Sequence, residues 1–93
     1  MEKYVLINEI ASFCFDYGIF NRDVGATEVK KGIGHMLDTA DLIESLINTI
    51  LSKVSYIKKA DLKKIEEILL ELERIRLGFE FSDLNKHSEK SYL

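Results

Sequence analysis

Apolar residues recur along most of the chain at the spacing of an α-helix. The clearest series lies in residues 29–57, where the gaps alternate between four and three residues. Its members are Val29, Ile33, Met36, Ala40, Ile43, Ile47, Ile50, Val54 and Ile57. Residues with this spacing share one side of a helix that packs against another along its length. The series predicts a helix over residues 28–57, whose regular part begins near His35 because Gly32 and Gly34 disfavour its first turns.

Two further segments have helical periodicity. In residues 3–17 the polar side chains share one narrow stripe, and the apolar ones cover about 200°, roughly twice the apolar arc of a helix that lies on one core. In residues 61–80 the apolar residues share one side and the charged residues face away from it. Gly18 and Gly78 are placed to end these helices, and Asp61 is placed to cap the start of the second.

The expected fold is therefore all-α, a small three-helix bundle with a long central helix. The helices over 28–57 and 61–80 form an antiparallel hairpin that reverses at Lys59-Ala60. The residues expected at the shared centre of the hairpin are Ile43, Ile47, Ile50, Leu69 and Leu72. Residues 1–81 form a single helical domain. Residues 82–93 are almost wholly polar and are expected to form a flexible C-terminal tail.

Composition and charge limit the class of protein. The chain has no proline and five glycines, too few turn residues for a many-stranded sheet. Its formal net charge of −3 supplies no basic excess for a phosphate backbone, so no nucleic-acid partner is expected. The apolar run before Asn8 is far shorter than the roughly 20 residues that span a bilayer, so no membrane association is expected. A single cysteine, Cys14, fits the reducing cytoplasm.

Acidic side chains and one histidine at regular spacing are the main candidates for catalytic chemistry. One set is spaced three residues apart and consists of His35, Asp38, Asp41 and Glu44. Such spacing allows neighbours to share a metal ion, but these residues lie away from the apolar stripe, as a solvated helix face does. Cys14 is central in an apolar arc, which indicates a buried small side chain. We expect no enzyme, no cofactor and no metal site. The alternative is a small metal-dependent all-α hydrolase that uses Asp38, Asp41, Glu44, Glu80 and Asp83.

The helix over residues 3–17 has more apolar surface than two other helices can cover. The aromatic residues expected at a contact with a partner or a second copy are Tyr4, Phe13, Phe15, Tyr17 and Phe20. Aromatic side chains are enriched at the centres of protein interfaces. The sequence therefore predicts a non-enzymatic interaction module, a regulator, inhibitor or immunity-type factor that binds another protein. A homodimer is expected from the same surface, and a purely structural homodimer is the alternative.

Overall fold

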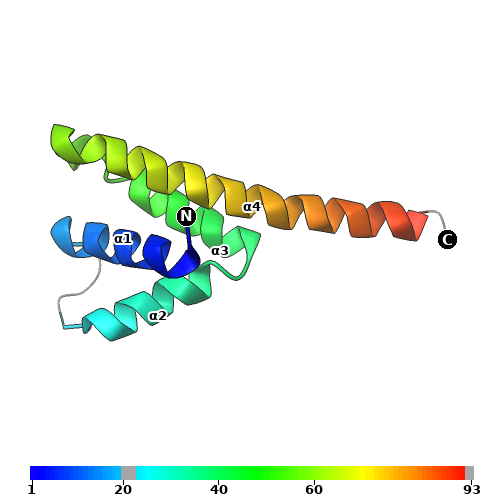
Figure 1. Cartoon of the computed structure of the whole chain (residues 1–93), viewed down its shortest axis with the longest axis horizontal. Helices are drawn as coiled ribbons and strands as arrows, with labels where there is room; N and C mark the ends of the chain where they lie inside the picture. The colour runs from blue at the N-terminus through cyan, green and yellow to red at the C-terminus, as the bar shows by residue number, and fades with distance from the viewer. Residues whose placement is uncertain (20–22, 92–93) are drawn as a thin grey trace.

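The computed structural model describes residues 1–19 and 23–91, and it describes the side chains of 1–19 and 23–81. Within these residues the chain is helical and contains no strand, which confirms the all-α class. The four α-helices in order are α1 (Lys3–Asp16), α2 (Ala26–Met36), α3 (Ala40–Leu51) and α4 (Leu62–Ser91). Two short 3-10 turns, Val54–Tyr56 and Lys59–Asp61, connect α3 to α4. Figure 1 shows α1 between α2 and α4, with α3 packed under α4.

The first helix ends as its sequence predicts. Gly18 has a φ of 63°, in the left-handed region that glycine adopts without steric cost. In this conformation the Ile19 N–H donates a hydrogen bond to the Cys14 carbonyl at 2.9 Å. This bond satisfies a carbonyl that the last helical turn would otherwise leave without a partner.

The prediction of one long helix over residues 28–57 is wrong, because the chain breaks between α2 and α3. Thr39 is extended, with φ −137° and ψ 152°, and its hydroxyl accepts a hydrogen bond from the Leu42 N–H at 3.2 Å. This N-cap begins a new helix. The apolar series continues across the break because Ile33 of α2 and Ile43 of α3 are both buried in the same core.

The segment after α3 also departs from the long-helix prediction. The helix ends at Leu51, and the Ser52 hydroxyl donates a hydrogen bond to the Thr49 carbonyl at 2.6 Å. Val54, a member of the predicted stripe, is exposed in the first 3-10 turn, whereas Ile57 returns to the core. The reversal expected at Lys59-Ala60 therefore takes two 3-10 turns, which begin at Val54.

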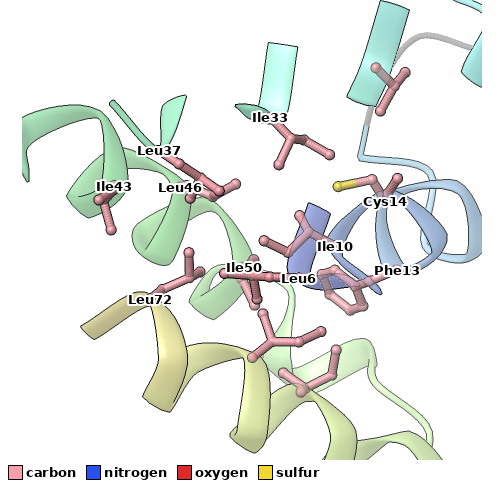
Figure 2. Close-up of a cluster of buried hydrophobic side chains, with 14 of the residues drawn as sticks. Leu6, Ile10, Phe13, Cys14, Ile33, Leu37, Ile43, Leu46, Ile50 and Leu72 are labelled. Carbon is pink, nitrogen blue, oxygen red and sulfur yellow. The ribbon is translucent and has the colours of Figure 1, made fainter. Parts of the chain in front are cut away.

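All four helices contribute to one hydrophobic core (Figure 2). The largest fully buried aliphatic side chains are Leu6, Ile10, Ile33, Ile43, Leu46, Ile50, Ile68 and Leu72. The wide apolar arc of α1 is thus covered from two sides by its own chain. At the centre of the hairpin, the prediction holds for Ile43, Ile50 and Leu72. Leu69 and Ile47 lie at the core edge, and Leu46 occupies the buried position assigned to Ile47.

The last helix is longer than predicted. It spans 30 residues, a length of about 45 Å, and extends well beyond the other helices in Figure 1. The predicted end near Gly78 is wrong, because the helix continues to Ser91. A single glycine within a helix costs only about 1 kcal/mol, which favourable neighbours offset. The flexibility expected for residues 82–93 stays a prediction, and residues 92–93 lie outside the described part.

Candidate interaction surface

The two faces of α4 both carry large apolar residues. The inner face buries Ile65, Ile68 and Leu72, which are at most 3% exposed. On the opposite face, Leu70 is 65% exposed, Leu77 is 51% exposed and Phe81 is 66% exposed. These three residues are separated by seven and four positions, so they follow one line along the helix. We call Leu70, Leu77 and Phe81 the outer stripe.

A row of carboxylates follows one edge of the outer stripe. It consists of Glu66, Glu73 and Glu80, each seven residues from the next, and we call it the acidic row. Arg76 Nη1 donates to Glu80 Oε1 at 2.7 Å, and Arg76 Nε donates to Glu73 Oε2 at 3.1 Å. The hydrogen bond from Arg76 lowers the pKa of the Glu73 carboxyl, which is therefore ionised at neutral pH. Three carboxylates and one guanidinium leave two negative charges along this edge.

Ion pairs within the chain involve Lys64 and Glu71 on the other edge of the outer stripe, where Lys63 and Glu67 are also exposed and carry opposite charges. Lys64 Nζ lies 2.9 Å from Glu9 Oε2 of α1. Arg74 Nη2 donates to Glu71 Oε2 at 2.9 Å, and this hydrogen bond lowers the pKa of the Glu71 carboxyl. The amino group of Met1 also lies 3.8 Å from Glu71 Oε2. Lys63 and Glu67 offset each other in charge, so the net negative charge beside the outer stripe lies in the acidic row.

The five aromatic residues that the sequence assigns to a contact differ in their positions. Phe13 is buried in the core, 4% exposed, and its ring packs against that of Tyr17. Tyr4 and Phe15 are exposed, at 64% and 46%, so they are available to a partner. Phe20 lies outside the described residues. The sequence reasoning missed the outer stripe, although the spacing of Leu70, Leu77 and Phe81 could have indicated a second apolar line on this helix.

Tyr17 has a role within the fold. Its hydroxyl donates a hydrogen bond to Asp61 Oδ2 at 2.6 Å and accepts one from the Lys58 N–H at 3.0 Å. The hydrogen bond to Asp61 is the main cause of a raised pKa of the Tyr17 phenol. Asp61, expected as the cap of the last helix, immediately precedes α4 and binds Tyr17 through its carboxylate. The end of α1 is thereby joined to the start of α4.

The carboxylates proposed for metal chemistry are dispersed. Asp38 lies in the turn between α2 and α3, 3.7 Å from Lys3 Nζ and 3.7 Å from His35 Nδ1. Asp41 and Glu44 are exposed on α3, Glu80 binds Arg76, and the Asp83 side chain lies outside the described part. Among the described side chains, no group of three or more histidine, cysteine, aspartate or glutamate residues is arranged to hold a metal ion.

The single cysteine is a core residue. Cys14 is 1% exposed and lies among buried apolar side chains in Figure 2. Burial raises the pKa of its thiol to about 12, so the thiol is protonated at neutral pH. A protonated and enclosed thiol is a poor nucleophile, which agrees with its expected role as a small buried side chain.

Comparison of the chain with protein-family models, with curated proteins and with solved structures finds no match. No helix within residues 1–19 and 23–91 is both long and apolar enough to cross a membrane. What the protein does is therefore inferred from its own side chains. Among the described residues, the outer stripe and the acidic row are exposed features of α4 on the side away from its buried residues.

Proposed function

We propose that the protein is a non-enzymatic interaction module that binds another protein chain through the outer stripe of α4. The observation that supports this proposal is the exposure of Leu70, Leu77 and Phe81, each more than half accessible, on the side of α4 opposite to its buried residues Ile65, Ile68 and Leu72. Single exposed apolar residues are ordinary on protein surfaces. Several of them on one side of a helix are typical of a surface that a partner covers.

The position of α4 favours such a role. Its C-terminal half extends past α1, α2 and α3 in Figure 1, so a partner can approach that half without displacing them. An amphipathic helix laid along the outer stripe would bury its leucines in the manner of a coiled coil. A regulator, an inhibitor or an immunity-type factor acts in this way, by occupying the surface of another protein.

A structural homodimer is the second candidate. The observation that favours it is the exposure of Tyr4 and Phe15 on α1, the helix from which self-association is expected. A two-fold contact through α1 would cover both side chains in each copy. Such a contact leaves the outer stripe free, so the two candidates involve different surfaces.

Single substitutions by aspartate test the outer stripe and the α1 contact independently. We expect the chain to retain a binding protein from extracts of its source, and we expect Leu77→Asp to lose that protein while the fold is preserved. Leu51→Asp is the matched control, because Leu51 is an exposed leucine at 46% on α3, outside the outer stripe. Phe15→Asp tests the α1 contact in the same way. Retention of the same proteins by wild type and Leu77→Asp would contradict a role for the outer stripe.

A further inference from the structure

We propose that the outer stripe receives an amphipathic helix of another protein, and that this helix carries lysine or arginine residues opposite the acidic row. This inference rests on the proposed function and adds the chemistry of the partner. It depends on where the charges of α4 lie relative to Leu70, Leu77 and Phe81.

The outer stripe has the spacing of a coiled-coil seam. Leu70 and Leu77 are seven residues apart. Arg74 lies four residues after Leu70, and Phe81 lies four residues after Leu77. In such a seam the leucines occupy equivalent positions, and the residues that flank the seam determine which helix can pair with it. The acidic row, Glu66, Glu73 and Glu80, occupies one of these flanking positions in three successive heptads.

A second copy of α4 is a poor match for this seam. Two copies that pair antiparallel about a two-fold axis bring the same edge of each helix together, so carboxylates of the acidic row would face carboxylates. Like charges in contact disfavour such a pair. In a parallel pair the acidic row of one helix would face the other edge of its partner helix. The flanking positions on that edge are Lys64, Glu71 and Gly78, and Lys64 already binds Glu9. Neither arrangement brings a free basic group opposite the acidic row.

Among the described side chains, the ion pairs with the acidic row come from Arg76. Arg76 binds both Glu73 and Glu80, but one guanidinium balances only one of these charges. Glu66 adds a third carboxylate at the same edge, and it is exposed. Charge complementarity therefore favours a partner with basic residues along its matching edge.

The test uses two designed helical peptides and the full-length chain. Both peptides carry leucine along one seam; one has lysine at the flanking positions and the other has glutamate there. Fluorescence anisotropy measures their binding to the chain at low salt. We expect the lysine peptide to bind at least about tenfold more tightly, because several exposed ion pairs add small contributions, and we expect the difference to shrink as salt rises.

Three variants identify the surface. Leu77→Asp should abolish binding of the lysine peptide, although it adds a negative charge that would strengthen a nonspecific attraction. The double substitution Glu73→Gln with Glu80→Gln should reduce the difference in affinity between the two peptides. Asp41→Asn is the matched control, since Asp41 is an exposed carboxylate on α3, and it should leave the difference unchanged.

The other outcomes overturn the inference in distinguishable ways. Equal binding of both peptides, lost in Leu77→Asp, would overturn the basic partner and keep the outer stripe as a docking surface. A dimer in light scattering that Leu77→Asp dissociates would show that a second copy covers the stripe. No binding of either peptide, together with a monomer whose Leu77→Asp variant retains the same proteins as wild type, would overturn both the inference and the proposed function.

Discussion

The inner and outer faces of α4 both carry large apolar residues, but the burial of these residues differs. Ile68 and Leu72 are enclosed by the other helices, whereas Leu70 and Leu77 are more than half exposed. These four residues differ in their angle about the helix axis relative to α3 and α1. Apolar content alone therefore does not distinguish a core residue from a docking residue on this helix. The helical phase, read against the packed neighbours, makes the distinction.

The start of α4 and its later turns differ in their contacts with the other helices. Near the start of the helix, Asp61 binds Tyr17 and Lys64 binds Glu9, so two contacts join α4 to α1. Further along, the described ion pairs of Arg76 are with Glu73 and Glu80 of the same helix. The start of α4 is thus part of the folded body, and its later turns depend more on local helix formation.

Truncation of one leucine on each face is expected to give the largest contrast. Leu72→Ala removes a fully buried side chain and should lower the free energy of unfolding by about 2–5 kcal/mol, through lost burial and a residual cavity. Leu70→Ala, two positions away and exposed, should change it by less than about 0.5 kcal/mol. Chemical denaturation followed by circular dichroism measures both. Equal losses would mean that the helical phase of α4 is wrong.

The sequence predicted the phase of the buried stripe better than the continuity of the helices. Alternating gaps of four and three residues state which side of a helix faces the core, and Ile33, Ile43 and Ile50 are indeed buried. The same gaps are compatible with a break wherever both pieces pack on one core. The signal for the break is local, because Thr39 is a favourable N-cap residue inside the regular apolar series.

The contact surface was less predictable than the fold. The aromatic residues of α1 were selected because their apolar arc is wide, yet α2 and α4 cover most of that arc and bury Phe13. The burial of the α1 side chains depends on how many helices pack around α1. The prediction of a single helix over 28–57 counted α2 and α3 as one helix. The outer stripe became evident only from the exposure of Leu70 and Leu77 among the described residues.

Removal of the Tyr17 hydroxyl is expected to have a smaller effect than Leu72→Ala. Tyr17→Phe keeps the ring beside Phe13 but leaves the Asp61 carboxylate and the Lys58 N–H without this partner. The midpoint of thermal unfolding should fall, because the contact that joins α1 to the start of α4 is lost. Tyr4→Phe, at an exposed position, is the matched control and should leave the midpoint unchanged.

The same hydrogen bond gives Tyr17 a recognisable alkaline titration. Its pKa is raised in the folded protein, so the stabilisation is complete below the usual tyrosine pKa near 10 and is lost as the pH rises through the higher folded value. Ultraviolet absorbance of tyrosinate should show an ionisation step above the usual tyrosine pKa in the wild-type protein. This late step should be missing in Tyr17→Phe. Absence of this late step from the wild-type protein would contradict the contact.

The smallest expected effect concerns the glycine in the later turns of α4. A Cβ added at Gly78 meets no other atom within 4 Å, so Gly78→Ala is sterically free and favours the local helix by about 1 kcal/mol. Because Gly78 follows the last buried residues of α4, this gain should appear as slower amide hydrogen exchange around residues 77–81, with an unchanged midpoint of global unfolding.

Gly32→Ala in α2 provides the comparison that makes the Gly78 result informative. A Cβ at Gly32 also meets nothing within 4 Å, but Gly32 lies between Val29 and Ile33, which are both buried in the core. Helix α2 is therefore expected to unfold together with the core, and Gly32→Ala should raise the global stability by about 0.5–1 kcal/mol. If Gly78→Ala raised the global stability as much as Gly32→Ala, the later turns of α4 would unfold together with the core. The contrast between the two ends of the helix would then be wrong.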